Sequence, residues 1–200
     1  MFRLIGGILG LFVTCICLAM QTVAGETDIR SLAVGWELER GVETPSYAIT
    51  EPASTNLNID SVVLSCEQGP NRRGLQLRLY LLRSGSLAPL GAGKALKDDP
   101  AVDLIVDDVS HPAQLLFADD FVVVADSADG AVPLLSDELL DILQVGRLME
   151  LRFQFAKVAH MNAPAFVGIA VVDLQAGSGG AAVSEVRRCA LQGWRITSSI

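Results

Sequence analysis

Histidine is the residue type in this chain with the most direct capacity for chemistry. The two histidines are His111, which precedes Pro112, and His160, which precedes Met161. A histidine beside a carboxylate can act as the general base of a hydrolase. The chain has no Gly-x-Ser-x-Gly motif, and neither histidine stands at metal-ligand spacing from a cysteine. We therefore expect no catalytic residue, no cofactor and no metal ion, with a hydrolase that uses His111 or His160 as the alternative.

Charge is segregated along the chain. Residues 68–97 hold six basic and no acidic residues, whereas residues 98–146 hold twelve acidic and no basic residues. One interpretation is self-complementation, in which the arginines of the first segment lie beside strands that carry aspartates of the second. The arginines concerned are Arg72, Arg73, Arg78 and Arg83, and the aspartates on the neighbouring strands are Asp103, Asp107 and Asp108.

The functional interpretation of the same pattern is an acidic surface that binds a protein partner of basic character. Complementary charge steers such an encounter and selects the partner. The candidate binding residues are Asp103, Asp107, Asp108, Asp119 and Asp120.

Two other motifs do not carry the function that they suggest. If Gly130 is aligned with the glycine of an EF-hand loop, Ala125 and Ser136 occupy the first and last ligand positions, so both carboxylates are missing. Residues 177–182 fit the pattern G-x-G-x-x-A, but no acidic residue follows about 20 positions on. These two stretches predict a turn and a strand-to-helix connection.

The first 25 residues have the pattern of a secretory signal peptide. Arg3 precedes an uncharged, mostly apolar run over residues 4–20, and small residues stand before Glu26, so cleavage after residue 24 or 25 fits equally well. A retained anchor is the alternative, because such a run is at the lower limit for a membrane-spanning helix. We expect a bacterial periplasmic or secreted protein, with a signal peptide over residues 1–25 and a single β-rich domain over residues 26–200.

Removal of the predicted leader changes the charge and the cysteine count. The remaining chain has 14 basic and 23 acidic residues, a net charge of −9, which argues against nucleic acid and anionic membrane as partners. Only Cys66 and Cys189 remain of the four cysteines. An oxidising compartment favours a disulfide between them, and two separate free thiols are the alternative.

Alternation of apolar and polar residues indicates a mainly antiparallel β fold. The pattern runs through residues 75–81 and 149–155, and turn residues at 69–74 predict a hairpin between the first of these and a strand that contains Cys66. Two short helices are predicted, one capped by Ser136 and ended by Gly146, the other over residues 180–192. The predicted architecture is a β-sandwich or partly open barrel. Further strands are predicted at residues 36–40, 47–50, 102–106, 114–118, 121–126, 131–135 and 165–174.

The order of these motifs resembles that of small periplasmic proteins of the invasion associated locus B type. The resemblance comprises Leu-Ala-Pro-Leu-Gly at residues 87–91, a strand at 102–108, Val-Pro-Leu-Leu at 132–135, and a helix with its following strand over 136–153. Residues 117–135 lack the paired cysteines that such proteins tend to carry. The resemblance implies an exported, non-enzymatic, β-rich protein linked to the cell envelope, and it brings no catalytic residue.

Together these observations predict a non-catalytic exported binding or envelope-associated protein that engages a protein partner through an acidic surface. They leave its oligomeric state open. Besides the hydrolase, the alternative is a β-barrel that holds a small apolar ligand or inhibits an exported enzyme.

Overall fold

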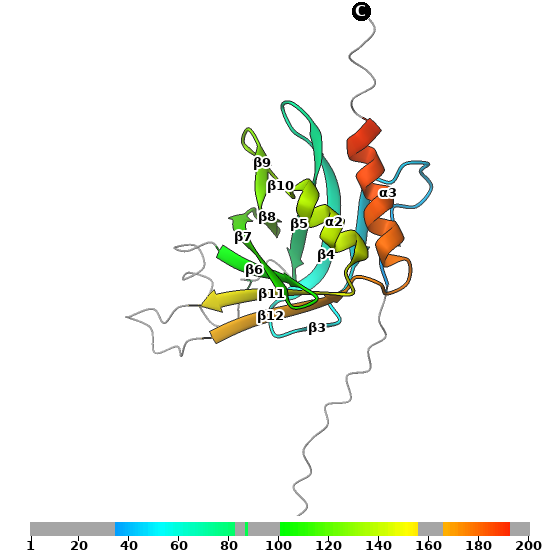
Figure 1. Cartoon of the computed structure of the whole chain (residues 1–200). Coiled ribbons are helices and arrows are strands. Elements are labelled where there is room, and N and C mark those ends of the chain that lie inside the picture. Colours follow the sequence, from blue (N-terminus) through cyan, green and yellow to red (C-terminus); the bar gives the residue numbers. More distant parts are fainter. Residues whose placement is uncertain (1–34, 83–86, 88–100, 156–165, 193–200) are drawn as a thin grey trace, which may run out of the picture. The chain divides into compact units, whose positions relative to one another are not determined.

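The computed structural model describes residues 35–82, 87, 101–155 and 166–192 (Figure 1). These residues belong to one compact unit. The predicted signal peptide, Arg83 and His160 lie outside the described residues. Within the described part no helix is long and apolar enough to cross a membrane.

Strands form most of the described structure, as the alternating pattern predicts. Ten of them make one antiparallel sheet in the order β1-β2-β4-β5-β8-β7-β6-β11-β12-β3, and β9 pairs with β10 in a separate hairpin. The strands are β1 (Glu37–Leu38), β2 (Tyr47–Thr50), β3 (Ser54–Thr55), β4 (Ile59–Gln68), β5 (Arg73–Leu81), β6 (Ala101–Val106), β7 (Val109–Phe117), β8 (Phe121–Ala125), β9 (Ser127–Asp129), β10 (Val132–Leu134), β11 (Leu148–Phe155) and β12 (Phe166–Asp173).

The large sheet curls until its far edge meets the connection between β2 and β4 (Figure 1). The backbone N–H of Ala53 donates to the carbonyl of Val171 at 2.8 Å, and that of Asn56 donates to Ile169 at 3.1 Å. The Asn56 side chain also bonds the backbone of β12 in both directions. This connection therefore covers an edge strand that would otherwise expose its backbone groups. Of the two architectures that the sequence predicts, the structure has the partly open barrel, in the form of a curled half-barrel.

The core lies on the inner face of the curl. Leu75, Leu77 and Leu79 of β5 are fully buried, and so are Leu151 and Phe153 of β11. Burial of each such side chain contributes about 1.5 to 3 kcal/mol of apolar transfer free energy. The two-residue periodicity of these segments is thus confirmed as the signal of a sheet with one buried face.

Two helices accompany the sheet, as predicted. Helix α2 (Asp137–Val145) begins after Ser136, whose Oγ accepts a hydrogen bond from the backbone N–H of Leu139, and it ends at Gly146. Helix α3 (Gly179–Gln192) buries Ala182, Val186 and Cys189. These two helices pack beside each other, and α3 also packs against β4 and β5 (Figure 1).

Two boundaries differ from the sequence-based prediction. The strand expected at 121–126 ends at Ala125, and residues 127–129 form β9, which pairs with β10 across the Asp129-Gly130 turn. The strand expected at 114–118 begins at Val109, because Asp107 and Asp108 both take positive φ and turn β6 directly into β7. Aspartate tolerates this conformation through its short polar side chain, so an acidic pair that was expected on a strand forms a tight turn.

Candidate binding site

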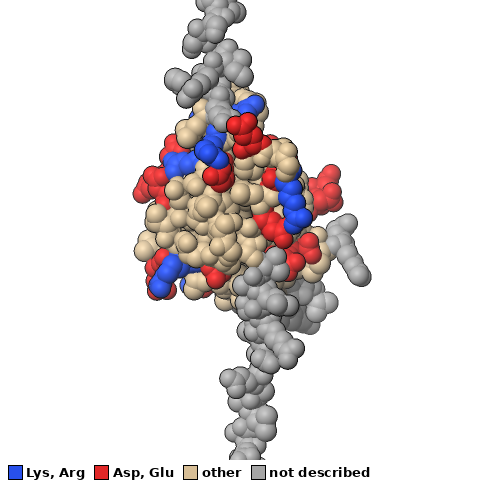
Figure 2. All heavy atoms as spheres, turned by 90° about the vertical axis from the view of Figure 1, so that its right-hand side faces the viewer, with Lys and Arg blue, Asp and Glu red and all other residues tan. Residues whose placement is uncertain are grey.

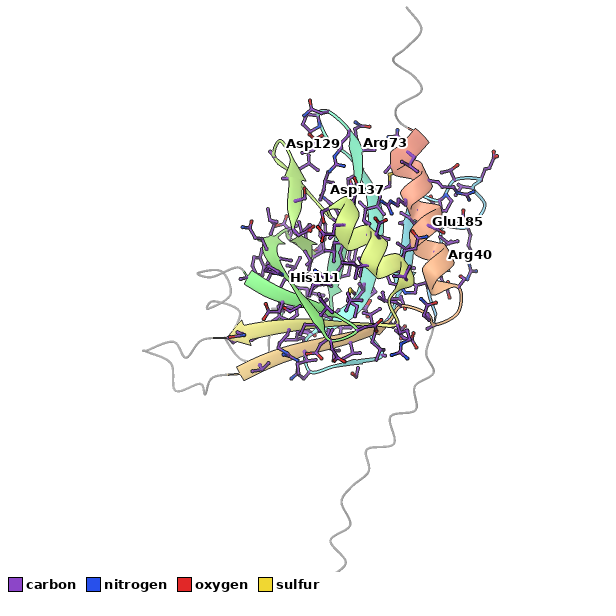
Figure 3. The ribbon with its side chains drawn as sticks, viewed as in Figure 1. Arg40, Arg73, His111, Asp129, Asp137 and Glu185 are labelled. Atoms are coloured by element: carbon purple, nitrogen blue, oxygen red, sulfur yellow. A yellow bond between two sulfur atoms is a disulfide. The ribbon has the colours of Figure 1, made fainter. Side chains whose placement is uncertain are left out.

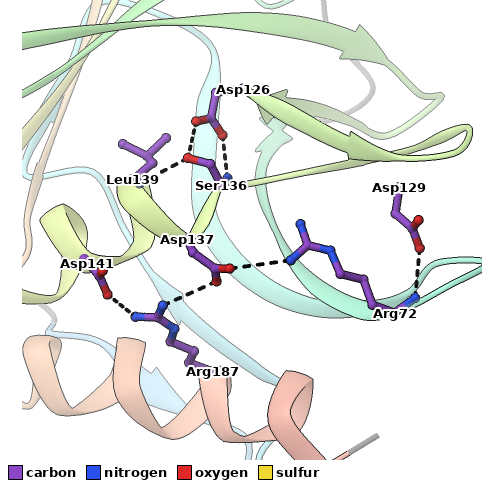
Figure 4. Close-up of polar contacts among 8 residues, drawn as sticks. All are labelled: Arg72, Asp126, Asp129, Ser136, Asp137, Leu139, Asp141 and Arg187. Carbon is purple, nitrogen blue, oxygen red and sulfur yellow. Dashed lines mark hydrogen bonds and ion pairs between the residues drawn. The ribbon is translucent and has the colours of Figure 1, made fainter. Parts of the chain in front are cut away.

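A pocket of about 360 Å³ lies where α2, α3 and the turn end of the β4–β5 hairpin meet. Its floor is apolar, and its rim carries three arginines and one aspartate (Figure 4 shows three of these four residues). Such a combination of apolar surface and a few charged groups is typical of sites that bind small ligands or side chains of a partner. The lining residues are Arg72, Arg73, Gly74, Leu75, Leu135, Asp137, Leu140, Arg187, Ala190 and Leu191.

The carboxylate of Asp129 positions one side of the rim. It accepts hydrogen bonds from the backbone N–H groups of Asn71 and Arg72 at 2.8 and 2.9 Å, and from the Asn71 amide at 2.7 Å. These bonds favour the ionised form and lower the pKa of Asp129, the Asn71 side-chain bond contributing most. A Cβ at Gly69 would collide with this carboxylate, so the hairpin turn requires glycine there. Asp129 thereby fixes the backbone from which Arg72 extends.

Asp126 fixes the start of α2 on the opposite side. Its carboxylate accepts hydrogen bonds from the backbone N–H of Ser136, at 2.7 Å, and from the Ser136 hydroxyl. Ser136 in turn caps the helix through Leu139, and Asp137 follows as the first helical residue (Figure 4). The acidic segment is therefore used here to build the wall of the pocket.

Arg187 joins the two helices across the pocket (Figure 4). One guanidinium nitrogen donates to Asp141, and the other lies 3.3 Å from Asp137. The hydrogen bond to Asp141, followed by the attraction of both carboxylates, raises the pKa of Arg187. Arg72 lies 3.6 Å from the same Asp137 carboxylate. Three side chains from separate elements therefore hold one another at the rim.

Cys66 and Cys189 hold α3 against the sheet. Their sulfur atoms are within disulfide-bonding distance, and their Cα atoms are 6.3 Å apart. Cys189 directly precedes Ala190 and Leu191 of the pocket lining. The pairing that the cysteine count and compartment predict is therefore present in the structure, and it supports one wall of the pocket.

Among the three arginines of the pocket, Arg73 is the one whose guanidinium forms no ion pair with a described carboxylate. It donates from Nε to Gln68 Oε1 at 3.0 Å and makes a 3.9 Å contact from Nη1 to the Cys189 sulfur. Of the arginines in the described ranges, Arg73 and Arg147 are the two that lie in no ion pair. Arg73 therefore has guanidinium hydrogens available for an acceptor outside the chain.

The predicted acidic binding residues do not gather on one surface. Asp107 and Asp108 form the turn at one end of β7, whereas Asp119 and Asp120 form the turn at its other end. Asp103 lies on β6, opposite Arg152 of β11. Positive and negative side chains alternate around the rim of the face seen in Figure 2.

Asp107 has a structural role, because its side chain binds backbone groups of the chain. Its carboxylate accepts hydrogen bonds from the backbone N–H groups of Leu148 and Arg147, at distances of 3.0 to 3.2 Å. These bonds lower the pKa of Asp107, the bond from Leu148 having the largest effect. Asp108, Asp119 and Asp120 are exposed to solvent.

Self-complementation of charge does occur, but with other partners than the sequence suggested. Arg72 pairs with Asp137, and Arg78 pairs with Glu67 at 2.6 Å. The expected partners of these arginines, Asp103 and Asp107, lie beside β11 and its preceding loop. The order of strands explains the difference, because β8 and β7 stand between β5 and β6.

His111 lies on the inner face of the curled sheet (Figure 3). It pairs with Leu104, which is fully buried, while Asp103 pairs with Pro112 and points to the other face. Its Nε2 is buried, and within the described ranges it has no hydrogen-bond partner. No described carboxylate is within ion-pair distance of His111, so the described residues do not form the histidine–carboxylate pair that a hydrolase would need.

A second hollow, of about 630 Å³, lies between β7 and the β9–β10 hairpin. Its lining consists mainly of alanine, proline and glycine, and its one charged residue, Asp126, is bonded to Ser136. It therefore offers no free charge with which to orient a ligand. Among the residues described there is also no cluster of three or more potential metal ligands.

Comparison of the chain with models of known protein families, with curated proteins and with solved structures finds no match. The pocket itself was not predicted from the sequence. Its arginines come from a hairpin turn and from the last helix, and only the fold brings them together. The basic segment over residues 68–97 is the available signal, but by itself it indicates only a complement to the acidic strands.

Proposed function

We propose that this chain is an exported, non-catalytic binding protein of the bacterial cell envelope, and that it binds its partner through the arginine-rimmed pocket between α2, α3 and the β4–β5 hairpin. The observation that carries the proposal is the arrangement of Arg72, Arg73 and Arg187 around an apolar floor. Every element that contributes to the pocket is fixed by bonds described above, so the site is formed before a partner arrives. Preorganisation of this kind reduces the entropic cost of binding.

Export is supported by three features of the sequence and the fold. The leader pattern of residues 1–25, the resemblance to proteins of the invasion associated locus B type and the placement of Cys66 near Cys189 all fit an oxidising compartment. A binding role is favoured over catalysis because the described lining of the pocket holds arginines and no serine, cysteine or histidine, and its one carboxylate, Asp137, is paired with Arg72 and Arg187. The hydrolase proposal depends on His160, together with residues outside the described ranges.

The acidic segment is a weaker candidate for the binding surface than the pocket. Its aspartates are divided between opposite ends of β7, and Asp126, Asp129 and Asp137 are engaged in contacts within the chain. An acidic surface that uses Asp119 and Asp120 remains a proposal, which charge reversal can test.

Site-specific photo-crosslinking in the native host tests the proposed site. A photoreactive amino acid replaces Leu191, which is 68% exposed at the pocket rim, or Val167, which is 49% exposed on β12 and lies outside the pocket lining. We expect a discrete envelope protein to be crosslinked from position 191 and not from position 167. Equal products from both positions, or a product from position 167 alone, would refute this site.

A further inference from the structure

We infer that the pocket recognises a carboxylate that is joined directly to an apolar chain. This inference rests on the proposed function and names the chemistry of the group that enters the site. Such a group can be a free carboxylic acid or the carboxyl end of a partner polypeptide, and both present the same head and tail to the pocket.

Local charge supports an anionic head group. The whole chain has a formal net charge of −8, yet the pocket and its first neighbours contain three arginines against the two aspartates Asp137 and Asp141. Arg187 is occupied by those two aspartates, which leaves the positive charge of Arg73 without a carboxylate partner in the described part. An anion that enters the rim therefore meets a locally positive site on an acidic molecule.

The geometry of the guanidinium supports a carboxylate in particular. Arg73 uses Nε for Gln68 and makes only a long sulfur contact from Nη1, so its Nη2 edge is free in the described structure. Arg72, beside it in the chain, is held only at 3.6 Å from Asp137 and is 40% exposed. A planar carboxylate can accept from both arginines at once, and charge-assisted bonds of this kind are stronger than neutral ones.

The floor supports an apolar tail. Leu75, Leu135 and Leu140 are almost fully buried but border the pocket, and the Leu191 side chain stands exposed at its mouth. A tail that fills the pocket gains dispersion contacts with these leucines and removes the exposed Leu191 side chain from water. The volume of about 360 Å³ is near the lower end of the range for ligand sites, which fits a short chain and not a long one.

The test is a titration of the folded, disulfide-bonded protein monitored by amide chemical shifts. The probes are octanoate, 1-octanol as its uncharged match, acetate as a head without a tail, and a short peptide that ends in leucine, with either a free carboxylate or a carboxamide. We expect octanoate, the free peptide or both to shift the amides of Gly74 and Leu135. The alcohol, the acetate and the carboxamide should each bind at least about tenfold more weakly, as the loss of a charge-assisted bond or of the tail requires.

Matched arginine variants locate the head group. Arg73→Gln should weaken binding of the carboxylate about tenfold and leave binding of the alcohol unchanged. Arg147→Gln removes the other arginine without an ion pair in the described ranges, and it should change neither affinity. Equal binding of octanoate and octanol, or equal losses in the two variants, would overturn the inference.

The two proposals fail separately. A crosslink from position 191 without any carboxylate preference would retain the site and reject the ligand chemistry. Carboxylate binding at Gly74 and Leu135 without a crosslinked partner would retain the ligand chemistry and reject the proposed envelope partner.

Discussion

The aspartates of the acidic segment play different roles at the pocket and at the turns that flank β7. At the pocket, aspartates of the acidic segment bind groups of the basic segment and of α3, through Asp129 to Arg72 and through Asp137 to Arg72 and Arg187. At the turns of β7, Asp108, Asp119 and Asp120 point into solvent. The difference shows that a run of like charge in a sequence does not by itself predict a charged surface, because the order of strands decides which of the charges lie together.

The disulfide should show the largest effect at the pocket end. Cys66 and Cys189 are 123 positions apart, so replacing both with serine should lower the free energy of unfolding by roughly 4 to 5 kcal/mol in the chain-entropy model. Urea unfolding of the oxidised protein and of the double variant measures this difference. Reductant should destabilise the parent protein to a similar degree and leave the double variant unchanged. An unchanged midpoint in all four samples would mean that the two cysteines are not bonded.

Truncation of a leucine in the apolar floor of the pocket should have the next largest effect on stability. Leu140 is 3% exposed, so Leu140→Ala should cost about 2 to 5 kcal/mol through lost burial and the cavity left behind. Leu148 is the matched control, because it is 51% exposed and its replacement by alanine should stay within about 0.5 kcal/mol. Chemical denaturation of both variants provides the comparison. Similar losses at the two positions would contradict the burial that the structure assigns to the floor.

The cap of α2 should have a smaller effect. Ser136→Ala removes the acceptor for the Leu139 N–H and the hydroxyl that bonds Asp126, and we expect a loss of about 1 kcal/mol. Ser184 lies inside α3 and bonds the Ala181 carbonyl, so Ser184→Ala should be neutral or slightly stabilising. Thermal unfolding of the two variants distinguishes a cap from an ordinary helical serine. An unchanged melting temperature in Ser136→Ala would contradict the conclusion that the Ser136 cap fixes the start of α2 and with it the position of Asp137.

The aspartates that bind backbone should be visible as a dependence of stability on pH. The pKa of Asp129 is lower in the folded state, because Asn71 and Arg72 donate to its carboxylate. The folded state therefore binds this proton less readily than the unfolded state, and stability is present above about pH 4 and falls as the pH drops below it. Asp129→Asn should flatten this fall in melting temperature, whereas Asp119→Asn should not. A parallel acid profile for the parent protein and Asp129→Asn would show that the carboxylate does not hold the turn.

The exposed acidic turn should show the smallest effect on stability. Reversal of charge at both Asp119 and Asp120 to lysine should change the free energy of unfolding by no more than about 0.5 kcal/mol, because both side chains face solvent. Urea unfolding at low and moderate salt measures it. A loss of several kcal/mol would reveal contacts of this turn that the described residues do not account for.

Local patterns predicted most of the elements correctly. The alternation in β5 and β11 reflects one buried face, and Ser136 followed by Asp137 and Glu138 marks a helix start through its own hydrogen bonds. These features depend on neighbours in the chain, so the sequence contains their cause. The cysteine pair was also predictable, because only two cysteines lie outside the predicted leader and both fall on elements with inward faces.

The binding site depends on contacts that local patterns do not encode. Arg72 and Arg187 meet at Asp137 only because α3, which follows β12 in the chain, packs against β4 and β5. The positive φ of Asp107 and Asp108 likewise places in a tight turn two aspartates that were expected on strands. Propensity therefore predicts the elements, whereas strand order determines which charges meet.

The most direct test compares the two charged regions in one crosslinking experiment. The photoreactive residue stays at position 191 in the native host, and the background carries either Arg73→Glu or the double reversal of Asp119 and Asp120 to lysine. Our account predicts that Arg73→Glu abolishes the crosslinked partner and that the acidic reversal leaves its yield unchanged. Loss of the partner in the acidic reversal, with full yield in Arg73→Glu, would contradict it and assign the binding surface to the acidic turns.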